Sequence, residues 1–204
     1  MGGTTGSAFY FDLASPFAYL AAEQALHAFA GAREPVVWTP VLAAELPGAA
    51  SFAFRCEAER DALYEDVGRR ATELGLQPLR WPDPFPFDSS LAQRVATYAK
   101  SIGRAVPFAQ AAFRQAFAGG RALDSEDAVV IAAAACEMHP AAVLKGAALR
   151  STAEQLARAT AEARAAGVRD VPAVLIGEHV YEGERSLPRA ALLSSAGEEE
   201  RERR

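Results

Sequence analysis

The sequence contains little cysteine: only Cys56 and Cys136 occur among its 204 residues. The two lie far apart and match no metal-ligand spacing, which argues against a zinc site. We therefore interpret both as reduced thiols, with a disulfide between them as the alternative. The three histidines, His27, His139 and His179, also show no ligand spacing. No metal is predicted.

Long apolar runs and a basic stripe are absent as well. No stretch approaches the roughly 18 uncharged residues of a membrane-spanning helix, so no membrane partner is expected. The net charge is −5 and the pI about 5.3, with scattered basic residues. This pattern argues against nucleic-acid binding. The N-terminal MGGTTGSAF lacks the basic and then apolar pattern of a secretory signal, which favours a cytoplasmic location.

The stretch FYFDLASPFAYL, residues 9–20, places a predicted strand directly before a helix. The apolar run stops at Asp12. Ser15 is suited to cap the helix and Pro16 to occupy its first position, where a missing N–H costs nothing. Residues 34–42, rich in β-branched and aromatic side chains, predict a second strand. Strand, helix and strand in this order form a βαβ unit with a parallel pair.

The middle of the chain is strand-poor. Helical spacing there is interrupted by glycines and by the proline-rich QPLRWPDPFPFDSS, which favours extended structure. A helix follows over 151–167, opened by the capping-box pattern Ser151-x-x-Glu154. Residues 173–181 then predict a hairpin, before a last helix from about residue 186.

Without its middle part, this order of elements is that of a thioredoxin fold. We therefore predict an α/β protein with a thioredoxin-like domain and a large all-helical insertion. The polar ends have nothing to attach them to a core and are expected to be flexible tails. The predicted bounds are 8–45 and 150–193 for the thioredoxin-like domain, 46–149 for the inserted helical domain, and 1–7 and 197–204 for the tails.

The chain resembles the DsbA-like thioredoxin superfamily, and within it the branch of 2-hydroxychromene-2-carboxylate isomerases and kappa-class glutathione transferases. The resemblance rests on FYFDLASPFAYL, GVRDVPAVLIGEHVYEGER and PFPFDSSLAQRVATYA, and extends from about residue 8 to 193. It implies that Ser15 stands where DsbA-type enzymes have their nucleophilic cysteine, and Ala18 where they have the resolving one. Dithiol exchange by the usual route is therefore excluded at this position.

The same resemblance implies that glutathione is the cofactor. Ser15 and the N-terminus of its helix would stabilise the thiolate, with Phe17 beside them. A cis Val171–Pro172 bond would present a short edge that pairs with the cysteinyl part. The γ-glutamyl ammonium would be held after the hairpin, with Glu184 at the family's acidic position and Glu182 close to it. The residues of this binding run are Glu182, Gly183, Glu184 and Arg185.

The loop after the second predicted strand lacks the Asn and Lys of family isomerases. Arg55 or Arg60 is therefore expected to supply the cation toward the substrate, and Asp88 replaces the family's Asn in the Phe-Pro-Phe stretch. We expect a glutathione-dependent isomerase of the 2-hydroxychromene-2-carboxylate type, acting on a small aromatic electrophile, an unsaturated aromatic acid. The resemblance also implies a possible homodimer. The alternatives are a kappa-class transferase or DsbA-family oxidoreductase without CxxC, and a non-catalytic thioredoxin-fold binding module.

Overall fold

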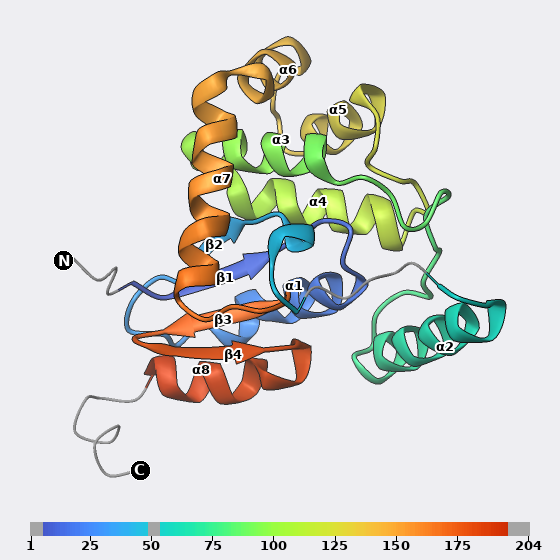
Figure 1. Cartoon of the computed structure of the whole chain (residues 1–204), viewed down its shortest axis with the longest axis vertical. Coiled ribbons are helices and arrows are strands. Elements are labelled where there is room, and N and C mark those ends of the chain that lie inside the picture. Colours follow the sequence, from blue (N-terminus) through green and yellow to red (C-terminus); the bar gives the residue numbers. More distant parts are fainter. Residues whose placement is uncertain (1–5, 49–53, 196–204) are drawn as a thin grey trace.

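The computed structural model describes residues 6–48 and 54–195 and shows one four-stranded sheet with helices around it (Figure 1). Residues 1–5 and 197–204 of the predicted tails lie outside the described residues. The strand order is β2-β1-β3-β4. β1 pairs in parallel with β2 and antiparallel with β3, and β3 and β4 form the predicted hairpin. The strands are β1 (Ala8–Phe11), β2 (Val37–Pro40), β3 (Ala173–Ile176) and β4 (His179–Glu182).

The described residues between β2 and β3 form helices and connections, and none of them joins the sheet. The predicted thioredoxin-like fold with a helical insertion is therefore confirmed, while the domain bounds at 45 and 150 stay a prediction. The α-helices are α1 (Pro16–Ala28), α2 (Glu57–Glu73), α3 (Ser90–Ser101), α4 (Ala105–Phe117), α5 (Glu126–Ala134), α6 (Pro140–Ala148), α7 (Arg150–Ala165) and α8 (Leu187–Ser195). Two 3₁₀ turns are η1 (Ala43–Glu45) and η2 (Glu184–Ser186).

The two faces of the sheet are covered differently, because successive strand side chains point to opposite faces. Phe9, Phe11 and Trp38 belong to the main core, together with buried residues of α1, α3, α4 and α8. Phe9 and Trp38 meet edge to face, with ring centroids 4.8 Å apart. The other face carries Tyr10 and packs mainly against α7, which descends from the helical block onto the sheet in Figure 1.

The start of α7 differs from the prediction. Leu149 is the N-cap and makes no side-chain capping bond, so the capping box of Ser151 and Glu154 is wrong. Glu154 instead accepts a hydrogen bond from Arg150 Nε at 2.6 Å. These residues are four apart on an exposed helix face, where opposite charges pair readily. Both parallel strands are also shorter than the predicted 8–13 and 34–42.

Candidate functional site

Residues 12–18, the Ser15 corner, connect the carboxyl end of β1 to the first turn of α1. The Ser15 N–H donates to the Asp12 carbonyl at 3.0 Å, which closes the turn. The Ser15 hydroxyl accepts from the Ala18 N–H at 3.2 Å and donates to the Val171 carbonyl at 3.3 Å. The predicted N-cap, with Pro16 after it, is thus confirmed. Ser15 is only 5% exposed. Its hydroxyl bonds to Ala18 nearby and to Val171 far along the chain, and these two bonds fix its position.

Val171 faces this corner from the segment before β3. The Val171–Pro172 bond is cis, as the resemblance implies. The Val171 N–H donates to Asp170 Oδ1 at 2.7 Å, and its carbonyl accepts the Ser15 hydroxyl.

A buried polar network lies beneath the Ser15 corner. The carboxylate of Asp12 accepts the N–H groups of Ala14 and Ala43 at 2.9 Å each, and the Ser89 side chain as well. Burial raises the pKa of Asp12, and these hydrogen bonds oppose the rise. Asp12 thereby joins the loop after β1 to η1 after β2.

Gln93 on α3 connects the helical block to the same end of the sheet. Its Nε2 donates to the Phe11 carbonyl at 2.9 Å and to the Val41 carbonyl at 2.5 Å. The Phe11 carbonyl also accepts the Val41 N–H at 3.1 Å, so Gln93 adds a second donor there. At the Val41 carbonyl, just past the end of β2, Gln93 supplies the donor that the strand pairing does not. Gln93 is fully buried, and its Oε1 has no partner among the described residues.

Glu184 on η2 is buried and bonds to Arg70 of α2, a residue that the sequence analysis missed. Arg70 also pairs with Asp66 at 2.7 Å, and its guanidinium lies 5.2 Å from the ring centroid of Phe17. The Nε of Arg70 is buried without a partner in the described part of the chain. Arg70 thus connects Phe17 to Glu184. The sequence around Arg70 gives no signal of this role.

The rest of the predicted binding run also contacts protein groups. Glu182 accepts the N–H groups of Arg169 and Asp170, at 2.5 and 3.2 Å, and so fixes the loop that leads to Val171. Gly183 has a φ of +79°, a conformation that favours glycine. The exposed Arg185 lies 3.6 Å from the Glu184 carboxylate.

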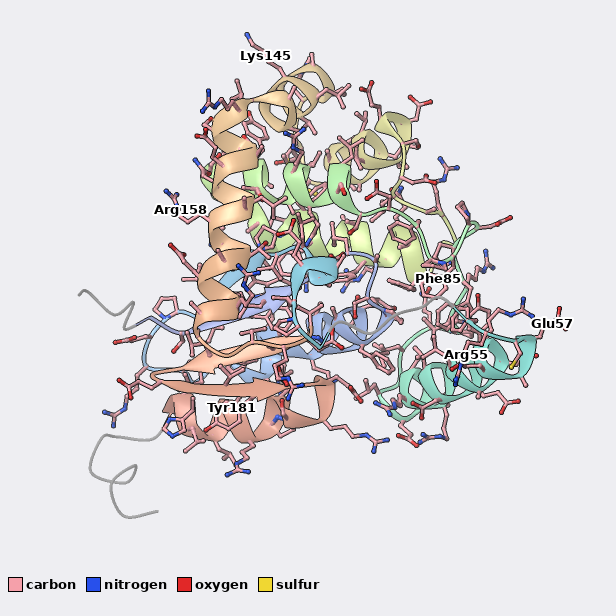
Figure 2. All side chains as sticks on the ribbon, viewed as in Figure 1. Arg55, Glu57, Phe85, Lys145, Arg158 and Tyr181 are labelled. Atoms are coloured by element: carbon pink, nitrogen blue, oxygen red, sulfur yellow. The ribbon has the colours of Figure 1, made fainter. Side chains whose placement is uncertain are left out.

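The predicted substrate residues have local partners. Arg55, at the edge of the molecule beside α2 in Figure 2, pairs with Glu59 at 3.2 Å. Arg60 pairs with Asp61 at 3.2 Å. Asp88 accepts the N–H and the hydroxyl of Ser90, which holds the pKa of Asp88 below its usual value. Residues 49–53, in the loop before Arg55, lie outside the described residues.

Within residues 6–48 and 54–195, no three His, Cys, Asp or Glu side chains are placed to hold a metal ion. Both cysteines are free thiols; Cys56 is exposed and Cys136 buried. Among the helices of this part, none is long and apolar enough to cross a membrane.

The DSBA-like thioredoxin domain family matches residues 8–192, and the chain therefore belongs to this family. No curated protein matches the chain.

Solved structures show the same fold. A 2-hydroxychromene-2-carboxylate isomerase shares 21% identity with a TM-score of 0.75, over 89% of this chain and 90% of its own. A probable DsbA oxidoreductase from Streptomyces coelicolor shares 18% identity with a TM-score of 0.76, over 92% and 88%. The cytosolic disulfide reductase DsbM from Pseudomonas aeruginosa, solved with GSH, shares 11% identity with a TM-score of 0.64, over 93% and 96%.

Proposed function

We propose that the protein is a glutathione-dependent isomerase of the 2-hydroxychromene-2-carboxylate type, acting on an unsaturated aromatic acid. The observation that carries the proposal is the Ser15 hydroxyl, held at the N-terminus of α1 against the Val171 carbonyl. A hydroxyl and a helix N-terminus stabilise an anion without any thiol of the protein. Bound glutathione would supply a thiolate that adds to the double bond and leaves again.

The side chains present fit glutathione at three points. The Ser15 hydroxyl would donate a hydrogen bond to the sulfur instead of to the Val171 carbonyl. Val171 would pair with the cysteinyl backbone. The third point is the charged group of Arg70, Asp66 and Glu184. It carries one cation and two anions, which suits the ammonium and carboxylate of a γ-glutamyl end. Arg70 Nε adds a buried donor without a partner among the described residues.

Stabilising the thiolate needs only a modest free energy. Lowering a thiol pKa of about 8.5 by about two units takes roughly 2.7 kcal/mol of preferential stabilisation. One charge-assisted hydrogen bond contributes about 1.5–3 kcal/mol and a helix N-terminus about 0.5–1 kcal/mol. The Ser15 corner supplies both.

The test is the pKa of the glutathione thiol bound to wild type and to Ser15→Ala, from thiolate absorbance across pH 5–9. We expect a higher thiol pKa in the variant and a turnover lower by about 10- to 150-fold, partly restored at higher pH. Glutathione binding, measured by calorimetry, should change less, because the other two points remain. Equal thiolate absorbance on both proteins would contradict the role of Ser15.

A matched control is Ser125→Ala. Ser125 caps α5 by accepting the Ala128 N–H, so its loss costs a helix cap without touching the Ser15 corner. It should lower stability and leave the thiol pKa unchanged. If both variants alter turnover equally, Ser15 serves only as a cap.

The second candidate is a DsbA-family oxidoreductase that acts through glutathione disulfide, favoured by membership of the DSBA-like family. The activities of the wild type separate the two candidates, and Ser15→Cys tests the position itself. It should form a mixed disulfide with glutathione but no internal disulfide, because Ala18 offers no thiol. If the wild type exchanges disulfides with glutathione and leaves the chromene acid unchanged, the result would favour the oxidoreductase. A wild type with neither activity would favour a binding module.

The cytoplasmic location and the homodimer stay predictions.

A further inference from the structure

A cavity of about 530 Å³ lies between α7 and the second face of the sheet. Its lining includes residues at the start of β1 and β2 and the turn after β3. The Ser15 corner follows the carboxyl end of β1, whereas the cavity extends along one face of that strand, from the residues before it to Tyr10. Ala8, Val37 and Leu175 give it an apolar floor. We call it the Lys100 cavity, after the cation in its wall.

Lys100 is one of two lysines in a chain whose other cations are arginines. It stands in the last turn of α3 and is half-buried. Its Nζ donates to Thr39 Oγ1 at 2.8 Å, and Thr39 in turn donates to the Val37 carbonyl at 3.2 Å. An ammonium has three protons, so two donors remain for another partner.

No carboxylate of the described residues forms an ion pair with Lys100. Glu162 lines the same cavity, and its carboxylate lies 4.0 Å from the Nε of Arg158. Figure 2 shows Arg158 on the outer side of α7. Burial lowers the pKa of Lys100, and the charge of Glu162 opposes this shift. A half-buried cation without a counter-ion in contact is a favourable position for an anion.

Tyr10 places a second donor at the cavity wall. It lies opposite Thr39 in the β1–β2 register, so the two side chains share a face of the sheet. Its hydroxyl has no hydrogen-bond partner among the residues that the structure describes. Burial and the charge of Glu162 raise the pKa of Tyr10, so the phenol keeps its proton and can donate it.

We propose that the Lys100 cavity binds a small monocarboxylate with an apolar body, whose carboxylate accepts hydrogen bonds from Lys100 and Tyr10. The volume lies within the roughly 300–1,000 Å³ of small-molecule sites. Glu162 and Glu178 also line the cavity, and their charges disfavour a second negative group on the ligand. The ligand therefore carries one charge, and its apolar part lies on the floor of the cavity.

The two lysines allow a direct test. Protein labelled with ¹³C at lysine Cε gives one signal from Lys100 and one from Lys145, which lies on α6 at the far end of the helical block (Figure 2). Titration with 3-phenylpropionate should move the Lys100 signal to saturation and leave the Lys145 signal in place. The neutral 3-phenylpropionamide and the dianionic benzylmalonate should move neither. An unmoved Lys100 signal, or equal movement of both, would overturn the proposal.

Variants identify the donors. Lys100→Met should weaken binding of 3-phenylpropionate by about 10- to 100-fold and Tyr10→Phe by about 2- to 10-fold. Lys145→Met should bind like wild type. Glu162→Gln should bind more tightly, because a like charge is removed. Unchanged binding in both Lys100→Met and Tyr10→Phe would refute the proposal. No glutathione is involved, so this result is independent of the proposed function.

Discussion

The carboxyl end of strand β1 and the face of β1 that lines the Lys100 cavity differ in how far the protein itself satisfies their polar groups. At the carboxyl end, Asp12, Ser15 and Gln93 all bond to backbone groups from distant parts of the chain. Along the face of β1 that lines the Lys100 cavity, Lys100 has one hydrogen-bond partner and Tyr10 has none among the described residues. Groups already bonded to the protein fix a geometry, whereas free donors around a cavity are available to a ligand. Changes at the carboxyl end should therefore cost more stability.

The largest loss is expected for Gln93→Leu. The substitution removes the donor of the buried Val41 carbonyl and one of the two donors of the Phe11 carbonyl, which should lower the free energy of unfolding by about 2–4 kcal/mol. Urea denaturation measures it. In the control Gln24→Leu, the lost bond is to the Leu20 carbonyl within α1, a carbonyl that the helix itself satisfies. Similar losses in both variants would mean that Gln93 does not hold the strand ends.

Asp12→Asn should change how stability depends on pH. Because burial raises the pKa of Asp12, the folded protein binds this proton more tightly than the unfolded chain. Wild type should therefore lose stability, relative to the variant, as pH rises from about 4 through the raised pKa. Because a single proton is involved, the difference in unfolding free energy changes by at most about 1.4 kcal/mol per pH unit. Denaturation at a series of pH values tests it, and parallel curves would contradict it.

Ser15→Ala should cost about 1 kcal/mol for the lost helix cap. It also removes the bond to Val171, which adds about 0.5–1.5 kcal/mol. Ser125→Ala loses a cap alone, so the difference between the two unfolding free energies reports the Ser15–Val171 bond. Equal losses would show that this bond contributes nothing.

Lys100→Met should change stability least, by about 0.5 kcal/mol or less near neutral pH, since one bond is lost and a half-buried charge removed. The pH dependence has the opposite sign to that of Asp12. Burial lowers the pKa of Lys100, so the folded protein binds this proton less tightly than the unfolded chain. Wild type should gain stability relative to the variant as pH rises toward about 10.4, the ordinary value of a lysine. A falling difference would contradict the burial of this amine.

The sequence is sufficient to predict features that depend on neighbouring residues. The order Ser15-Pro16 predicts the helix cap, and the glycines and prolines of the middle of the chain predict that it contains few strands. The network around Asp12 and the pairing of Arg70 with Glu184 are different. They join elements far apart in the chain, and no local pattern indicates which polar residue on α2 meets η2. The Lys100 cavity likewise exists because α7 leaves part of a sheet face uncovered.

The pairing of β1 with β3 has a consequence for the order of events during synthesis. β1 and β2 emerge from the ribosome early, but the other edge of β1 stays unpaired until Ala173–Ile176 have been made. An open strand edge is prone to wrong pairing, which the intervening helices would have to limit. Val171, whose carbonyl accepts the Ser15 hydroxyl, arrives just before β3. A chain that stopped short of this segment would still contain the serine cap and the helical insertion, but not the second half of the corner at which the proposed chemistry takes place.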